Sequence, residues 1–279
     1  MKKRKLTLFD YILTIFFILV CIVMLIPLWK VLIDSLDLRT AYGMKLWPEK
    51  FGLDGYKSVF TNPTLYQPLI VSVITTIAGT FIGLLLSTLG AYVLIQKELP
   101  GRTFLSGMLL FTMIFNGGLI PTYLVMNNLG ITDTLWVVVM LPALNVFNLV
   151  LMRNFFEGIP ESLFEAAAID GCTPMATFFR IVLPLSKAAL ASIGLMFAVA
   201  YWNDYTTYKI YIVNSDLFNF QMKLRSIILG SDLPSATGSA TENTVRNAAT
   251  MVAIIPFMII YPFAQKYFVT GINLGAVKE

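Results

Sequence analysis

The sequence predicts an all-α membrane protein with six transmembrane helices. Of its 279 residues, 57% are hydrophobic and 13% are charged, whereas a globular protein has about 45–50% apolar and about 25% charged residues. A helix needs about 20 apolar residues to cross about 30 Å of hydrocarbon. Six runs approach that length, and we expect a single transmembrane domain over residues 1–279. The runs cover residues 11–33, 68–95, 104–126, 134–152, 185–203 and 248–265.

The first run follows four consecutive basic residues, Lys2 to Lys5. A secretory signal peptide also begins with basic residues, but its apolar core has about 7–15 residues and is followed by a small-x-small cleavage site. The run 11–33 is longer and has no obvious site of that kind. We therefore expect it to be retained as the first span.

The basic residues predict which connections face the cytoplasm, because short cytoplasmic loops carry an excess of Lys and Arg. They lie in both tails, between the second and third runs, and around the connection of the fourth and fifth, whereas the connection 127–133 has none. We therefore expect both termini in the cytoplasm and two long outer loops over residues 34–67 and 204–247. Beyond the N-terminal tail, the deciding residues are Lys97, Arg102, Arg153, Arg180, Lys187, Lys266 and Lys278.

The residue types argue against several classes of enzyme and carrier. The chain has no histidine, the commonest metal ligand and general base, and no G-x-x-x-x-G-K-[ST] phosphate loop. Its two cysteines, Cys21 and Cys172, have dissimilar settings, so we expect both to be small buried or half-buried residues. The span centres lack charged residues, which disfavours an ion-coupled secondary carrier. We therefore expect a chain with no catalytic, cofactor-binding or metal-binding residues.

Between the fourth and fifth runs lies a more polar segment, ESLFEAAAIDGCTPMATFFRIVLP (161–184). Ser162 is the expected N-cap of a helix over residues 163–169, because Glu165 follows it at the spacing of a capping box. Gly171 occupies the position after the helix where a left-handed conformation is favoured. The segment therefore predicts a short helix that ends in a tight turn.

A second short helix is expected to follow, with Thr173 as its cap and Pro174 at its first position. Apolar residues at i, i+3, i+4 and i+7 predict one apolar stripe along it, before Pro184 marks the return to the membrane. The hairpin cannot bury this stripe by itself. It either lies on the lipid interface or under its own bundle, or it docks a cytoplasmic partner, and the residues alone leave both open. The stripe consists of Met175, Phe178, Phe179 and Val182.

The spacing within this hairpin resembles a known signature. Glu165-Ala166-Ala167, three residues, Gly171, nine residues and Ile181-x-Leu183-Pro184 match E-A-A-x3-G-x9-I-x-L-P. This is the EAA signature of the membrane-spanning subunits of ATP-binding-cassette (ABC) importers. Seven specified positions at fixed spacing make the match specific.

Four further stretches resemble the second permease subunit of carbohydrate importers, the maltose-permease G type. They are FNGGLIPTY (115–123), LMRNFFEGIP (151–160), AYWNDY (200–205) and YPFAQKYFVTGINLGAVKE (261–279). The first and last of them lean toward the branch that takes up oligosaccharides or polysaccharide fragments. The resemblance covers nearly the whole chain from about residue 68.

The resemblance implies a type I ABC importer permease fold in the bacterial cytoplasmic membrane. It implies a heterodimer with a homologous permease subunit, two copies of a cytoplasmic ABC ATPase that binds ATP and Mg, and an extracytoplasmic sugar-binding protein. The hairpin would be the coupling helix that sits in a cleft of the ATPase. The ATPase-coupling residues would be Glu165, pairing with a basic residue, and Ala166, Ala167, Gly171, Ile181, Leu183 and Pro184, shaping the docking fold.

The C-terminal residues resemble the family tail that reaches the ATPase dimer interface, although Glu279 stands where a glycine is frequent. The tail residues are Gly275, Ala276, Val277 and Lys278. The second outer loop corresponds in location to the loop that, in the maltose importer, probes the sugar-binding protein.

A polar path through the membrane has only weak candidates in the sequence. Intramembrane asparagines either hold helices together or line such a path. Aromatic residues near the outer end of the fifth run either form an interfacial belt or face a sugar ring. The path candidates are Asn116, Asn145, Asn148, Trp202 and Asn203. Alternatives to a carbohydrate permease are an ABC permease for a non-sugar solute, an ion-coupled carrier and a structural membrane anchor.

Overall fold

The computed structural model of the chain describes residues 7–39, 43, 45–230 and 238–276. Within these residues the chain is helical, with one isolated bridge between Asp37 and Phe51 and no strand. The all-α fold is therefore confirmed for the described part of the chain. Two compact units share the chain: residues 1–66 with 224–255, and residues 67–223 with 256–279.

Three helices are long and apolar enough to cross a membrane by themselves: α1 (Leu8–Leu36), α3 (Pro63–Ile95) and the Glu242–Pro262 part of α14 (Glu242–Ala276). The count within the described residues rises to five if each of two bent helix pairs is one span. The presence of six transmembrane helices therefore stays a prediction.

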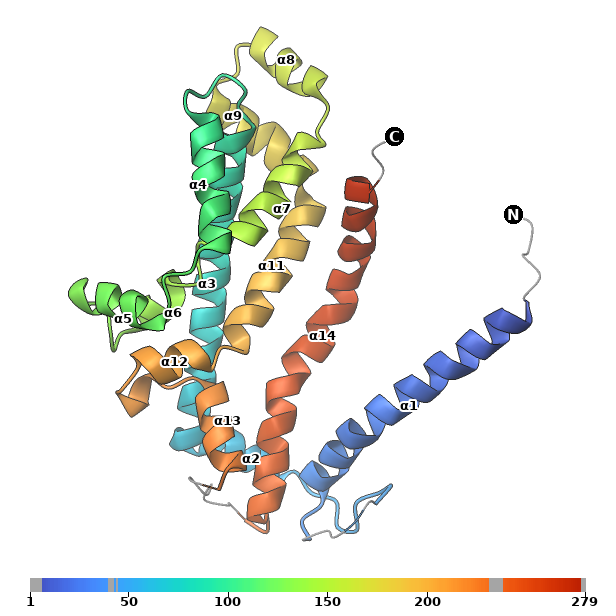
Figure 1. Ribbon diagram of the computed structural model, residues 1–279. Coiled ribbons are helices and arrows are strands. Elements are labelled where there is room, and N and C mark those ends of the chain that lie inside the picture. Colours follow the sequence, from blue (N-terminus) through green and yellow to red (C-terminus); the bar gives the residue numbers. More distant parts are fainter. Residues whose placement is uncertain (1–6, 40–42, 44, 231–237, 277–279) are drawn as a thin grey trace. The chain divides into compact units, whose positions relative to one another are not determined.

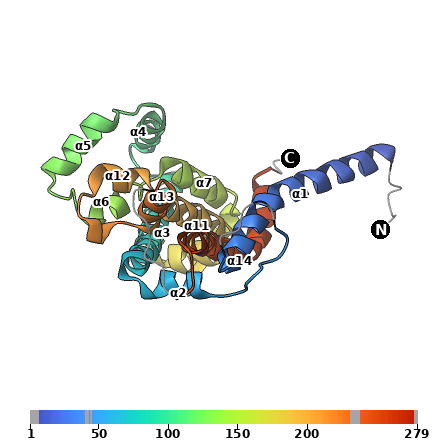
Figure 2. The same cartoon turned by 90° about the horizontal axis from the view of Figure 1, so that it is seen from below.

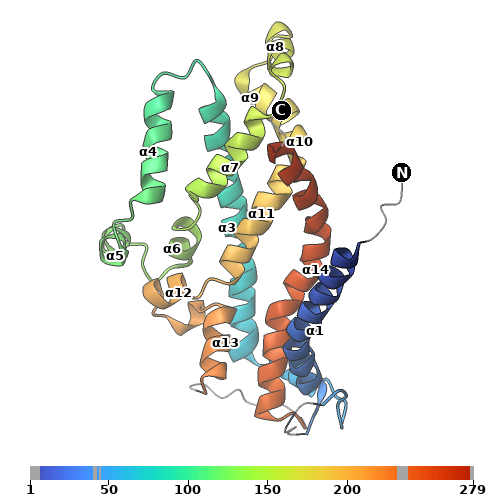
Figure 3. The same cartoon turned by 45° about the vertical axis from the view of Figure 1, so that its right-hand side comes forward.

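The expected third span is not a continuous helix. It consists of α4 (Arg102–Ile114) and α5 (Leu119–Asn128), which meet at 117°, and α5 lies across the direction of α4 in Figures 1 and 3. Gly118 at the junction has φ 92° and ψ 173°, a conformation that only glycine adopts readily. The predicted run 104–126 missed this bend although it contains Gly118, whose conformation permits it.

The fourth expected span is also divided, whereas the fifth is one helix. The fourth contains α6 (Leu135–Met140) and α7 (Val146–Glu157). The fifth, over residues 185–203, corresponds to the continuous helix α11 (Lys187–Trp202), and the 81° bend lies before it, at the junction with the segment Pro174–Leu185. Proline lies in the break between α6 and α7 and just before the start of α11, where its missing N–H prevents a continuous helix.

The first unit is held together around Asp37, which follows α1. Its buried carboxylate accepts hydrogen bonds from the backbone N–H groups of Arg39, Glu49 and Lys50, at 3.0, 3.0 and 3.2 Å. The Thr244 hydroxyl of α14 donates to the Asp37 carbonyl at 2.7 Å. This carboxylate therefore orders the turn that follows α1. The unit also contains α2 (Asp54–Thr61).

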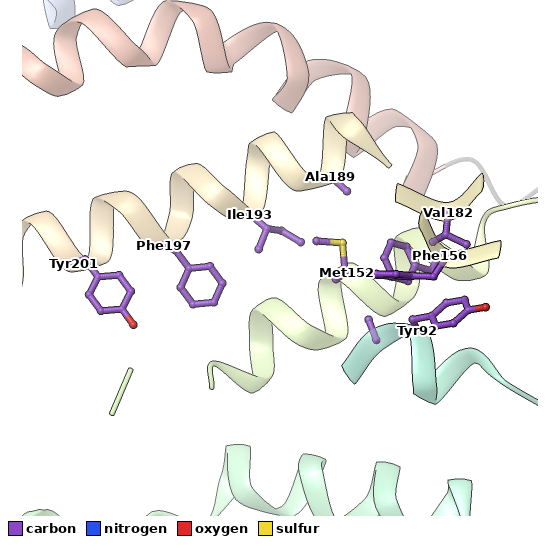
Figure 4. Close-up of a cluster of buried hydrophobic side chains, with 10 residues drawn as sticks. Tyr92, Met152, Phe156, Val182, Ala189, Ile193, Phe197 and Tyr201 are labelled. Carbon is purple, nitrogen blue, oxygen red and sulfur yellow. The ribbon is translucent and has the colours of Figure 1, made fainter. Parts of the chain in front are cut away.

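The second unit packs α3 against α7 and α11, which run alongside one another in Figures 1 and 3. Glycines on α3 permit close approach: a Cβ at Gly79 or Gly83 would collide with the rings of Tyr201 and Phe197 on α11. The Tyr201 hydroxyl also donates to the Val139 carbonyl of α6 at 2.6 Å. The buried side chains of this core are drawn in Figure 4.

A second core in the same unit lies where α6 meets α12 (Thr206–Tyr211), and these two helices are close together in Figures 1 and 2. Val137 and Val138 pack there against Tyr208 and Tyr211. The chain then continues through η2 (Ser215–Leu217) and α13 (Phe220–Ile228). This core anchors the segment that follows α11.

The expectation that both cysteines are buried or half-buried is wrong for one of them. Cys172 is half-buried, whereas Cys21 is exposed. Cys21 lies on α1, whose apolar side chains point outward along most of its length. A span that contacts lipid exposes its side chains in this way.

Candidate functional site

The first helix of the hairpin, α8 (Glu161–Ile169), begins earlier than predicted. Its N-cap is Pro160, which makes no side-chain capping bond, so the prediction of Ser162 as N-cap is wrong. The fixed φ of proline suits the entry to a helix. Glu161 in the first turn also adds a favourable charge at the positive end of the helix dipole.

The turn after α8 is a complete Schellman motif. Gly171 has φ +70°, its N–H donates to the Ala168 carbonyl at 3.1 Å, and the Cys172 N–H donates to the Ala167 carbonyl at 2.9 Å. This pair of bonds satisfies two carbonyls at the helix end. The left-handed glycine predicted from the sequence is therefore confirmed.

The second helix starts as predicted and then widens. Thr173 accepts a hydrogen bond from the Ala176 N–H at 3.2 Å, and Pro174 is the first residue of α9 (Pro174–Thr177). A π-helical turn, η1 (Phe178–Val182), follows and leads into α10 (Leu183–Leu185). Pro184 explains the widening, because it lacks an N–H and its ring would clash with the carbonyl four residues earlier in an α-helix.

The π turn divides the predicted apolar stripe. Phe178 and Val182 are buried in the core of the second unit, whereas Met175 and Phe179 are 57% and 58% exposed. The prediction of one stripe on one face is therefore wrong, because it assumed an uninterrupted α-helical period. The hairpin buries half of its apolar residues against its own chain and leaves the other half open.

The signature residues lie on both sides of this division. Glu165, Ala166, Gly171 and Pro184 are exposed, Ile181 and Leu183 are half-buried, and Ala167 is buried. A cavity of about 710 Å³ adjoins α8, and Glu165 and Cys172 are among its lining residues together with the ends of α3 and α7. The exposed carboxylate of Glu165 therefore lies at the cavity that α8 forms with the ends of α3 and α7.

Charged residues of neighbouring connections gather at this end of the unit. Lys97 after α3 forms an ion pair with Glu161 at 2.6 Å, and Glu157 at the end of α7 pairs with Arg153 at 3.0 Å and Arg102 at 3.5 Å. The basic residues that the orientation argument assigned to two connections therefore meet beside the hairpin. Ion pairs as exposed as these add little stability.

Tyr92 near the end of α3 contacts the hairpin with both its hydroxyl and its ring. Its hydroxyl donates to the Pro174 carbonyl at 2.8 Å, and its ring lies 4.9 Å from that of Phe178. The two residues of the hydrogen bond are 82 positions apart. Sequence reasoning missed this contact, because nothing in the helical period of α3 distinguishes Tyr92 from other core residues.

The path candidates have local structural contacts. Asn116 accepts from the Gly118 N–H at 2.8 Å, Asn145 caps α7 by accepting from the Asn148 N–H at 3.0 Å, and Asn203 donates to the Val199 carbonyl at 3.0 Å. Asn148 and Trp202 are buried. A role of these residues in a translocation path stays a prediction.

The C-terminal tail is only partly described. Gly275 and Ala276 are in the last turn of α14, whereas Val277 and Lys278 lie outside the described residues. Residues 231–237 of the second outer loop lie outside them as well.

Comparison with known proteins gives a family and a fold. Residues 103–273 match the family described as "Binding-protein-dependent transport system inner membrane component". The chain is 40% identical, over 100% of both sequences, to the polygalacturonan/rhamnogalacturonan transport system permease protein YtcP of Bacillus subtilis (strain 168). It is 26% identical, again over 100% of both, to the arabinooligosaccharides transport system permease protein AraQ of Halalkalibacterium halodurans.

Among solved structures, the chain is similar to one in the crystal structure of a bacterial ABC transporter involved in the import of the acidic polysaccharide alginate. The TM-score is 0.86 and the identity 28%, covering 95% of this chain and 100% of the other. This similarity gives the type I ABC permease fold that the resemblance implied. The chain is a multi-pass membrane protein and belongs to the family of binding-protein-dependent transport system inner membrane components.

Proposed function

We propose that the chain is one permease subunit of a binding-protein-dependent importer for oligosaccharides. Its partners would be a second, homologous permease subunit, two copies of a cytoplasmic ABC ATPase and an extracytoplasmic sugar-binding protein. ATP and Mg bind the ATPase, and both termini of the chain lie in the cytoplasm. The observation that carries this proposal is the hairpin of residues 161–184. In it the EAA signature coincides with a solvent-exposed Schellman turn.

The coupling role of the hairpin is supported by its exposed residues. Glu165 and Ala166 offer a carboxylate beside a low surface, and Met175 and Phe179 add apolar area. A buried apolar contact supplies binding energy, and the carboxylate selects a basic partner. An ATPase cleft with an arginine or lysine at its edge fits this surface. The mechanism would be alternating access, in which closure of the ATPase dimer moves the hairpin and the membrane-spanning helices follow.

Fragments of acidic polysaccharides are the substrate class that the comparisons favour. The 40% identical relative is named for polygalacturonan and rhamnogalacturonan, and the similar solved transporter imports alginate. Uronic acids, which carry a carboxylate on each ring, are common to these polymers. The loaded binding protein must favour the outward-facing state, because a ligand shifts an equilibrium only by its differential affinity for the two states.

The coupling surface is tested by Glu165→Lys and Gly171→Asp in the complete importer. Reversing a charge opposite a basic residue costs several kcal/mol, so we expect Glu165→Lys to reduce ATPase co-purification by about tenfold or more. Gly171→Asp also strains the left-handed turn and should act in the same direction. Uptake of oligogalacturonides should fall in parallel. Uptake of malto-oligosaccharides is measured beside it, to compare an uncharged oligosaccharide with the acidic one as substrate.

Two matched variants separate docking from folding. Glu242→Lys makes the same charge change at another exposed site, the first residue of α14, and it should leave ATPase co-purification unchanged. Phe179→Ala should weaken co-purification without unfolding the chain, whereas Phe178→Ala should destabilise it by about 3–5 kcal/mol. Normal co-purification and uptake in both Glu165→Lys and Gly171→Asp would exclude the coupling role. Uptake that needs no ATPase would point to a secondary carrier.

A further inference from the structure

The two helices of the hairpin are attached to the chain in different ways. In α8 the one fully buried residue is Ala167, Phe164 is half-buried at the edge of the core, and the ion pair with the α3–α4 connection joins side chains that are 72% (Lys97) and 65% (Glu161) exposed. An ion pair between exposed, flexible side chains transmits little force, because solvent and rotamer freedom weaken it. The attachment of α8 therefore buries fewer side chains than that of the segment that follows it.

The segment after the Schellman turn is rooted in the core. Thr177, Phe178 and Val182 are buried, and the last two share a core with Met152 and Phe156 of α7 and Tyr92 of α3 (Figure 4). A close-packed core moves as a unit rather than deforming continuously. Any displacement of α9 and η1 must therefore involve α3 and α7.

Tyr92 connects α3 to the start of α9. It is 8% exposed, its ring packs on Phe178, and its hydroxyl donates to the carbonyl of Pro174, the first residue of α9. The contact thus joins α3 to the start of the second helix of the hairpin. The Phe178 N–H also donates to the Pro174 carbonyl, so that carbonyl keeps a partner when the tyrosine hydroxyl is removed.

The helix that carries Tyr92 contacts both other helices of the core. Along α3, Gly83 meets Phe197 of α11, and Gly90 meets Leu149 of α7. These contacts leave no room for independent sliding. If α3 is displaced at Tyr92, α7 and α11 must therefore move as well, because their side chains pack directly against the glycine backbone of α3.

We propose that Tyr92 is the positioning residue through which movement of the 161–184 hairpin enters the membrane-spanning helices. The proposal rests on the coupling function proposed above and adds the route by which the hairpin acts. The hydroxyl bond to Pro174 holds α9 in register with α3, while α8 adapts to the ATPase surface. Loss of this bond uncouples ATP hydrolysis from transport and leaves the docking surface intact.

The test is Tyr92→Phe in the full importer, reconstituted in liposomes with its binding protein and oligogalacturonides. The change keeps the ring against Phe178 and removes the hydroxyl, with its hydrogen bonds to the Pro174 carbonyl and the Gln96 side chain. We expect oligogalacturonide transported per ATP hydrolysed to fall by about two- to tenfold, the range that corresponds to one neutral hydrogen bond, with ATPase co-purification as in the wild type. A purely structural role would lower complex yield and both rates together and leave their ratio unchanged.

Tyr201→Phe is the matched control. Tyr201 is 3% exposed and donates to a backbone carbonyl, that of Val139, at 2.6 Å, but it lies far from the hairpin along α11. Its removal should leave the transport ratio unchanged. An unchanged ratio in Tyr92→Phe, or an equal loss in Tyr201→Phe, would overturn the proposal. Loss of co-purification in Glu165→Lys together with a normal Tyr92→Phe would reject this route alone and keep the coupling function.

A measurement on the wild-type importer tests the same route without a substitution. Amide hydrogen exchange is compared with and without a non-hydrolysable ATP analogue and the loaded binding protein. We expect the exchange rates of α9 and of the last turns of α3 to change together. A change in α9 with none in α3 would contradict the proposal even if the Tyr92→Phe complex could not be purified.

Discussion

Asp133 shows how one side chain can join two connecting segments of the second unit. It has φ +56°, which non-glycine residues rarely adopt. Its Oδ1 accepts from the backbone N–H groups of Val213 and Asn214, each at 2.8 Å, and its own N–H donates to the Tyr211 carbonyl at 2.9 Å. The N–H groups of Asn214 and Val213 lower the pKa of Asp133 below its ordinary value of 3.8. The connection between the third and fourth predicted spans is thereby tied to the segment after α12.

Replacing Asp133 should loosen that segment. Asp133→Ala removes the acceptor of two N–H groups, and we expect hydrogen exchange at Val213 and Asn214 to become severalfold faster than in the wild type. Because the folded pKa is lowered, the stabilisation is present above pH 3.8 and is lost as the pH falls through the folded pKa. The ratio of the exchange rates of Asp133→Ala to those of the wild type should therefore be constant above about pH 5. It should approach one below pH 3.8.

The control is Asp133→Asn, which tolerates the same backbone conformation and keeps one acceptor oxygen without the charge. Its exchange rates should fall between those of the wild type and Asp133→Ala. The ratio of its rates to those of Asp133→Ala should not depend on pH. Equal exchange rates in all three proteins would mean that the carboxylate does not hold the segment.

At the scale of elements, the bend between α4 and α5 depends on Gly118. We expect Gly118→Ala to cost about 1–3 kcal/mol, because its φ and ψ lie in a region that alanine avoids, and to lower the Tm of the solubilised importer by several degrees. Gly117→Ala is the matched control, since Gly117 also has open space for a Cβ and lacks a positive φ. Equal Tm values for the two variants would indicate a straight span over residues 104–126, as the sequence predicts.

Local signals in the hairpin were readable from the sequence because they act within a few residues. Gly171, Thr173 and Pro174 each determine the conformation at or next to their own position, and the structure has all three as predicted. The apolar stripe was predicted wrongly because Pro184 changes the helical period upstream of itself. The partner of Tyr92 could not be predicted, because a contact across 82 positions depends on packing that no local pattern encodes.

At the scale of the whole molecule, the proposed orientation can be tested with the native cysteine of the hairpin. In a Cys21→Ser background, Cys172 is the remaining thiol. We expect a membrane-impermeant maleimide to label it in inside-out vesicles and not in right-side-out vesicles, because the basic residues beside the hairpin favour the cytoplasmic side. The chain is expressed without its ATPase so that docking does not cover the thiol.

The opposite result is expected for a cysteine in the second outer loop. Ser215→Cys, at an exposed position, in a chain without the native cysteines should be labelled only in right-side-out vesicles. Labelling of both sites from the same side would refute the orientation. The hydrophobic composition predicted a membrane protein without difficulty, whereas the number of continuous helices depended on bends that composition does not reveal.

The contact of α3 with α11 also has a consequence for how such sequences diverge. Gly79 and Gly83 adjoin the rings of Tyr201 and Phe197, so each pair shares a fixed volume. A side chain can enlarge on one helix only if its neighbour on the other shrinks. The two residues of each pair should therefore vary jointly among relatives. A single substitution in one pair should not change the distance between α3 and α11.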